Sequence, residues 1–160
     1  MRTNAVIDID QIEKILPQST PFLFIDKVLT FTEHKDLLAI KNITANEWFC
    51  EGGNKIKTEF PGTLLIEAAS QAALILYYKS MIKNGDEKPK LFLGKVKAVF
   101  HKSVRFGDQL RINVKAAKML KELGIMNIKI DVEKDEIAEI DIMYSKHDGH
   151  DKRLWSNHEK

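Results

Sequence analysis

The second half of the chain alternates apolar and polar residues, which is the pattern of β-strands with one buried face. Apolar residues at 110, 112, 114 and 116 alternate with charged or amide residues, and the same period recurs at 126–132 and 138–144. Residues 91–100 form a further apolar stretch, and Gly107, Gly124 and Asp135 mark the turns. The pattern predicts an antiparallel meander of three or four strands.

The first half of the chain predicts a short helix, a hairpin and one long helix. Asp10 is a suitable N-cap for a helix over residues 11–16, which Pro17 ends. Apolar and β-branched residues predict strands over 22–32 and 37–43, joined by a polar turn. Pro61-Gly62 opens a helix that runs to about residue 83. Its apolar residues point in every direction, so we expect this helix to be buried.

Together these elements predict an α+β fold in which one antiparallel sheet wraps around one long buried helix. We expect a single domain over residues 1–146, followed by a polar C-terminal tail over residues 147–160. A long sheet around a single helix leaves edges to cover, which predicts a dimer. The long loop at 46–60, which holds Gly52 and Gly53, is a candidate functional segment.

Charge and cysteine content narrow the function classes. The chain of 160 residues has 25 basic and 23 acidic residues, yet residues 79–118 alone hold eleven basic and three acidic ones. This basic middle is either a solvated sheet face or a surface for an acidic partner. Nucleic acid is disfavoured because no stacking aromatic pattern accompanies the basic residues. The lone cysteine, Cys50, excludes an intramolecular disulfide, and no apolar run predicts a membrane span or signal peptide. We therefore expect a cytoplasmic protein.

Several motifs, in order, resemble one family. Residues 16–28, LPQSTPFLFIDKV, are similar to the opening LPHRYPFLLVDRV of the FabZ-type 3-hydroxyacyl-acyl-carrier-protein dehydratases. Residues 41–47, KNITANE, resemble the family's KNVTxNE, and residues 61–68, PGTLLIEA, resemble its PGVLIVEA. Gln71 stands where the family also has a glutamine. Residues 94–110 resemble GKV…F…PVVPGDQL. The resemblance runs from about Ile12 to Tyr144 and implies the hotdog fold.

The resemblance also implies a reaction and a site. The family removes water from a 3-hydroxyacyl thioester carried on acyl carrier protein, using no cofactor or metal. A histidine takes the proton beside the thioester carbonyl, and a helix glutamate of the other subunit helps the hydroxyl leave. Glu67 matches that glutamate, and Gly62 lies at the helix N-terminus, whose free N–H groups polarise the carbonyl. Gly53, Pro61 and Gln71 are the matching substrate-binding positions.

The residues of the helix support this role for Glu67 independently. A carboxylate among apolar residues is costly to bury in its charged form, which suits a group that must carry a proton. The structural alternative is a carboxylate hydrogen-bonded to Gln71 one turn later. The position of Gly62 has a simpler alternative too, because glycine after proline is common in ordinary turns.

The family histidine is missing. The family writes GHFPGxPxxPG before the helix, whereas residues 52–62 read GGNKIKTEFPG. The ungapped alignment places the histidine on Gly53, and a gapped alternative places it on Glu59. His34 lies in a predicted turn and His101 follows a strand, so neither is an obvious substitute. The tail histidines stand among polar residues and indicate a solvated end rather than a metal site.

Three hypotheses follow for the activity. The first is a FabZ-like dehydratase that is weakened by the missing histidine or completed by a second subunit that carries it. The second is an acyl thioesterase that uses Glu67 and Gly62 without a histidine. The third is a non-catalytic subunit that binds acyl carrier protein or acyl groups. Because carrier proteins are acidic in this family, Lys95, Lys97, Lys102 and Arg105 are expected to form the docking surface.

Overall fold

The computed structural model describes residues 7–50, 59–83 and 85–146. The helices are α1 (Ile9–Ile15), the short 3-10 helix η1 (Trp48–Cys50) and α2 (Gly62–Met81). The strands are β1 (Lys27–Thr32), β2 (Asp36–Asn42), β3 (Leu91–Phe100), β4 (Gln109–Leu120), β5 (Leu123–Val132) and β6 (Asp135–Lys146). The predicted tail lies outside the described residues, so the domain boundary at residue 146 stays a prediction.

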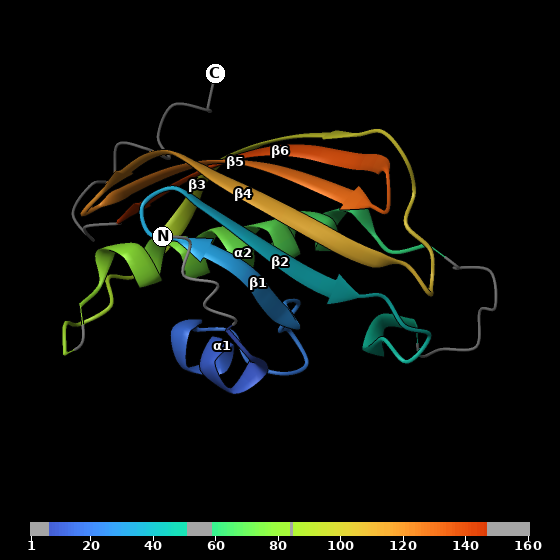
Figure 1. Cartoon of the computed structure of the whole chain (residues 1–160), viewed down its shortest axis with the longest axis horizontal. Coiled ribbons are helices and arrows are strands. Elements are labelled where there is room, and N and C mark those ends of the chain that lie inside the picture. Colours follow the sequence, from blue (N-terminus) through green and yellow to red (C-terminus); the bar gives the residue numbers. More distant parts are fainter. Residues whose placement is uncertain (1–6, 51–58, 84, 147–160) are drawn as a thin grey trace, which may run out of the picture.

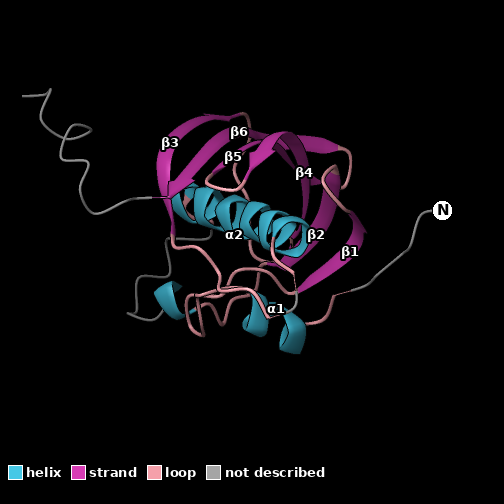
Figure 2. Ribbon diagram, turned by 90° about the vertical axis from the view of Figure 1, so that its left-hand side faces the viewer, coloured by secondary structure: helices cyan, strands magenta, loops and turns pink. Residues whose placement is uncertain are grey.

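The strands of the described residues form one antiparallel sheet in the order β1-β2-β4-β5-β6-β3. Figure 1 shows the sheet lying along α2, and Figure 2 shows it curving around the helix. Helix α1 and the loops lie on the other side of α2 (Figure 2). The predicted architecture, an antiparallel sheet around one buried helix, is therefore confirmed. The sheet has two edges, β1 and β3.

Helix α2 is buried over most of its surface, as its sequence predicts. Thirteen of its twenty residues are buried, and they lie on all sides of the helix. Four of them are alanines, Ala68, Ala69, Ala72 and Ala73, whose small side chains let neighbouring backbone approach closely. Burial of this apolar surface drives the packing of the helix against the sheet. No helix among the described residues combines the length and apolar character that a bilayer crossing requires.

Two element boundaries differ from those predicted, each because of a specific hydrogen bond. Helix α1 begins earlier, because Asp8 rather than Asp10 is its N-cap. The Asp8 carboxylate accepts from the Gln11 N–H at 3.1 Å, and the Asp8 N–H donates to the Gln11 side chain at 3.2 Å, forming a capping box. The first strand begins at Lys27 instead of Phe22, since the backbone around residues 22–24 bonds to a helix side chain.

A glycine of β5 makes room for a tyrosine of the helix. Gly124 lies inside β5, two residues beyond the turn at Lys121 and Glu122, so the predicted hairpin is present but the glycine belongs to the strand. A Cβ atom at Gly124 would lie 3.1 Å from Cδ2 of Tyr77. The Tyr77 ring is fully buried, and its hydroxyl donates to the carbonyls of Leu120 at 2.8 Å and Lys121 at 2.7 Å. The ring is therefore held where a larger residue 124 would clash.

We expect Gly124→Ala to lower the free energy of unfolding by about 1–3 kcal/mol, because overpacking forces the fixed ring or the strand to move. Urea denaturation measures the loss. The matched control is Gly94→Ala, where the new Cβ would meet the flexible end of Met143 at 3.3 Å. That side chain can yield, so the control should lose clearly less. Equal losses for the two variants would contradict this account of Gly124.

Candidate active site

Glu67 is the carboxylate of the second turn of α2, and it is half-buried. Its Oε1 atom accepts from the side-chain amide of Gln71 at 2.7 Å and from that of Gln18 at 3.4 Å. Among the described residues no donor reaches the second oxygen, Oε2. Within the described residues, the carboxylate is thus anchored through Oε1 only.

Gln71 anchors Glu67 because its own amide is fully engaged. This side chain is completely buried. Its Nε2 also donates to the carbonyl of Phe22 at 2.8 Å, and its Oε1 accepts from the N–H of Phe24 at 2.8 Å. The bond between Glu67 and Gln71 that stood as the structural alternative is therefore present. The same bond places the carboxylate, so it is compatible with a functional role.

The N-terminus of α2 lies about one and a half turns before Glu67. Pro61 is the N-cap and makes no side-chain capping bond. Within the described part of the chain, the N–H groups of Gly62 and Thr63 have no acceptor. A Cβ atom at Gly62 would lie 3.3 Å from the Phe100 ring of β3, so glycine permits this close contact. Free N–H groups and the helix dipole favour an anion or a polarised carbonyl here.

A cluster of aromatic side chains lies beside the site. The sequence analysis did not single out its members as site residues. It joins the α1–β1 segment, the η1 region and the start of α2. Ring centroids lie 5.0–6.4 Å apart along the chain of contacts Trp48–Phe22–Phe24–Phe60–Phe49. Phe22 and Trp48 are each more than two-fifths exposed, which is unusual for large aromatic side chains beside a core. The cluster supports the backbone that holds Gln71.

A buried ion pair joins β2 to the segment just before η1. Nζ of Lys41 lies 2.7 Å from Oε1 of Glu47, and both side chains are nine-tenths buried. Lys41 is on β2, and Glu47 stands just before η1. Removing one partner would leave a buried charge without compensation. Both residues belong to the motif KNITANE, but their spacing in the sequence did not predict that they form an ion pair.

Gln18 is a further site residue that the sequence did not single out. The sequence showed Gln18 only as a difference from the family motif, which has a histidine at this position. Gly53, by contrast, lies outside the described residues, so its predicted role is untested. Cys50 is the last residue of η1.

The two described histidines do not contact Glu67. His34 lies in the β1–β2 turn, where its N–H donates to the Ser80 hydroxyl at 2.9 Å near the far end of α2. His101 follows β3, and its Nε2 lies 3.3 Å from Glu136. His101, Glu136 and Glu139 have the spacing of a metal cluster, but Lys129 already bridges the two carboxylates at 3.0 and 2.9 Å.

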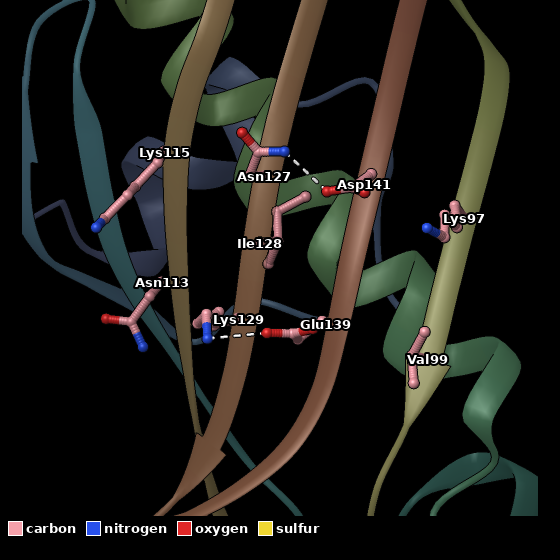
Figure 3. A pocket seen from close by; sticks show the side chains of 9 residues that line it. All are labelled: Lys97, Val99, Asn113, Lys115, Asn127, Ile128, Lys129, Glu139 and Asp141. Atoms are coloured by element: carbon pink, nitrogen blue, oxygen red, sulfur yellow. Dashed lines mark hydrogen bonds and ion pairs between the residues drawn. The ribbon is translucent and has the colours of Figure 1, made fainter.

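The four predicted docking residues fall into two groups. Lys95 and Lys97 are exposed on β3. Lys97 lines a hollow of about 230 Å³, and Figure 3 shows this residue on the sheet face away from α2. Lys102 and Arg105 lie in the connection from β3 to β4. Lys102 is paired with Asp135 at 2.6 Å.

Arg105 lies close to the start of α2. The Arg105 backbone pairs with Glu59 in an isolated β-bridge, and the N–H of Phe60 donates to the Val104 carbonyl at 2.8 Å. Both Glu59 and Phe60 stand just before Pro61, the N-cap of the helix. Lys102 and Arg105 therefore belong to a segment that approaches the helix N-terminus.

The curved sheet around a buried helix, with a carboxylate near the helix N-terminus, defines a hotdog-fold protein. A solved structure with the same fold is the dehydratase heterocomplex ApeI:P from Xenorhabdus doucetiae, with a TM-score of 0.73 and 12% identity. The match covers 86% of this chain and 91% of that chain.

Sequence comparison identifies the family within this fold. Residues 16–141 match the FabA-like domain family. The 3-hydroxyacyl-[acyl-carrier-protein] dehydratase FabZ of Shewanella woodyi is 36% identical over 140 residues, covering 88% of this chain and 92% of that protein. FabZ of Coxiella burnetii is 39% identical over 134 residues, covering 83% and 92%. The chain belongs to the FabA-like domain family and is a FabZ-like member of it.

We expect Gln71→Met to lower the free energy of unfolding by about 2–4 kcal/mol. The substitution keeps the approximate size of the side chain but leaves the N–H of Phe24 and the carbonyl of Phe22 without partners, at a cost of about 1–3 kcal/mol each. Urea denaturation measures the change. The control is Gln109→Met, at an exposed amide that bonds Asn42 at 2.8 Å, where we expect a change within about 0.5 kcal/mol. A loss no larger than the control's would refute the anchoring role.

Proposed function

We propose that this chain is a subunit of a 3-hydroxyacyl-acyl-carrier-protein dehydratase, in which Glu67 is the acid–base carboxylate. The observation that carries the proposal is the geometry at Glu67. One oxygen is held by two amides, the other is open, and free N–H groups of the helix N-terminus lie on the same helix. The FabZ relatives support the substrate class, and they favour dehydration over the thioesterase and the non-catalytic alternatives.

The reaction assigns one task to each part of this site. The N–H of Gly62 donates to the thioester carbonyl and stabilises the negative charge that develops when a base removes a proton from C2. Glu67 gives its proton to the hydroxyl on C3 as the C–O bond breaks, which releases water and leaves a C2–C3 double bond. The proton on the base then returns to Glu67 through solvent. Pro61 and Gln71 shape and support the site.

The base is the part that this chain lacks, because Gly53 takes the position of the family histidine in the ungapped alignment. In the family, histidine and glutamate come from different subunits. A dimer of two identical chains would therefore have two sites without a base. A dimer with a histidine-bearing relative would have one site that pairs the partner's histidine with Glu67. The heterocomplex formed by the similar dehydratase ApeI:P supports this assembly.

The edge strand β3 is the surface through which we expect the second subunit to bind. Four large apolar side chains of this strand are 44–52% exposed: Phe92, Leu93, Val99 and Phe100. A long strand edge of this kind is a template for pairing with another strand. Phe100 also touches the N-terminus of α2, so a subunit bound here would approach the site. We place the complex in the cytoplasm, where Cys50 would stay reduced.

Restoring the histidine tests the proposal directly. We expect the wild-type chain alone to remove water slowly, and Gly53→His to raise the rate by about 10²–10⁴-fold, the usual contribution of a general base. Mass spectrometry of a 3-hydroxyacyl carrier protein measures water loss and thioester cleavage together.

The double variant Gly53→His, Glu67→Gln is the control, and we expect it to lose the gained activity. If the double variant kept the increased rate of water loss, Glu67 would have no role in the reaction. Release of free acid and thiol would instead support a thioesterase. No gain from Gly53→His would contradict the alignment that places the histidine there.

Lys102 and Arg105 are the residues we propose for docking of the acidic carrier protein, because their segment reaches the helix N-terminus. We expect Lys102→Glu with Arg105→Glu to raise the Kd for carrier protein about tenfold at low salt, and less at high salt. Calorimetry measures the binding. Lys95→Glu with Lys97→Glu makes the same charge change on the outer sheet face and should alter Kd less than about twofold. The reverse ranking would move the docking surface to that face.

A further inference from the structure

Gln18 lies on the segment between α1 and β1, and this segment is held on both sides of it. Before Gln18, the N–H of the buried residue Leu16 donates to the Ile12 carbonyl at 2.9 Å and ends the helix. After Gln18, the N–H of Phe22 donates to the Ser19 carbonyl at 2.8 Å. The bonds of Phe22 and Phe24 to Gln71 place this segment against α2, and the side chain of Gln18 reaches Glu67 from outside the helix.

The two amides that meet at Glu67 differ in how firmly they are held. Gln71 makes three hydrogen bonds of 2.7–2.8 Å, to Glu67, to the carbonyl of Phe22 and from the N–H of Phe24. If the Gln71 amide were rotated by about 180°, its oxygen would face the oxygens of Glu67 and Phe22, and its NH₂ group would face the N–H of Phe24. Gln71 is thus a permanent donor to Glu67.

Gln18 has no such constraint. Its Nε2 makes one long bond of 3.4 Å to Glu67, and its Oε1 is buried without a partner among the described residues. A buried acceptor without a partner is rare in a stable structure and calls for a specific explanation. Because no described residue bonds that oxygen, Glu67 is the only partner among the described residues that can set the orientation of the amide.

A carboxyl group that carries a proton and loses it needs different partners in its two states. The ionised form only accepts hydrogen bonds, whereas the protonated form also donates one. An amide offers an N–H group in one orientation and a carbonyl oxygen in the other. Gln71 can serve the first state only, and Gln18 can serve both.

We propose that Gln18 is a positioning residue whose side-chain amide rotates by about 180° when Glu67 gains or loses its proton. It donates through Nε2 to Oε1 of the ionised carboxylate, and it accepts through its own Oε1 when that Glu67 oxygen carries the proton at rest. During turnover the proton passes to the substrate from the open Oε2, and Gln18 then donates to Oε1 again. The inference rests on the proposed function in one respect, since it gives Glu67 a proton to exchange during the reaction. It adds a residue that holds the catalytic carboxyl in place through both states.

Among the residues that the structure describes, the remaining surroundings of Glu67 do not supply a competing proton partner. Within the described residues, Tyr144 of β6 is a titratable group close enough for the charge of Glu67 to raise its pKa. Burial raises the pKa of the Tyr144 phenol well above its usual range, and its hydroxyl donates to the Ser70 carbonyl at 2.7 Å. Tyr144 therefore stays neutral while Glu67 changes its charge.

Nuclear magnetic resonance tests the proposal without requiring turnover. The side-chain amide signals of Gln18 and Gln71 are assigned with the variants Gln18→Met and Gln71→Met. The amide signals and the Glu67 carboxyl carbon are then followed through a pH titration. We expect the Gln18 amide to shift with the same midpoint as the Glu67 carbon and to shift more than the Gln71 amide.

Glu67→Gln is the control, and in it the Gln18 amide should be insensitive to pH over this range. A Gln18 signal that stays constant while the wild-type Glu67 titrates would overturn the proposal. An equal shift of the Gln18 and Gln71 amides would overturn the turning of Gln18, because a fixed donor would respond in the same way.

Kinetics then separates this proposal from the proposed function. In the Gly53→His background, we expect Gln18→Met to lower kcat by about three- to tenfold with KM changed less than twofold, as for one lost hydrogen bond. Gln18→His, which offers both a donor and an acceptor, should recover most of kcat, and Gln18→Lys, a donor only, should not. If the Gln18 amide follows Glu67 but no variant removes water, the proposed function fails and the inference about Gln18 stands.

Discussion

The site depends on one buried amide. Gln71 sits inside the core, where an unsatisfied polar group is costly, and two of its three hydrogen bonds can form only if the segment at residues 22–24 lies against α2. The same bonds interrupt what would otherwise be the start of the first strand. They also leave the second N–H of the amide aimed at Glu67. Fold and site are therefore joined through one side chain, and a change at Gln71 acts on both.

The helix meets two demands that conflict. To be covered by a curved sheet it must be apolar on every side, and most of α2 is. A reacting carboxyl must nevertheless be reachable. Under the proposed function Glu67 meets both demands, because it lies near the N-terminal end of α2, where Oε1 accepts from two amides and no donor among the described residues reaches Oε2. The free N–H groups of Gly62 and Thr63 belong to the same end, so the carboxyl and the polarising groups share one rigid element.

Several features of the site came from contacts that sequence spacing does not reveal. Gln18 and Glu67 are 49 residues apart, and only the packing of the α1–β1 segment against α2 brings them together. Lys41 and Glu47 are six residues apart, but their pairing depends on a loop that turns back towards β2. The aromatic cluster likewise joins three separate segments. The predicted helix, in contrast, follows from a local apolar pattern, and Glu67 and Gly62 follow from the motif around it.

The sequence by itself determined the order and type of the elements, the burial of α2 and the membership of a dehydratase family. These are local properties, because strand alternation, an all-round apolar helix and short motifs are each written within a few residues. The tertiary structure decided which amides hold Glu67, which basic residues lie near the helix N-terminus and which edge of the sheet is exposed. Those properties depend on contacts between residues far apart in the chain, and hydrogen-bond geometry and burial select such contacts only when the whole fold has formed.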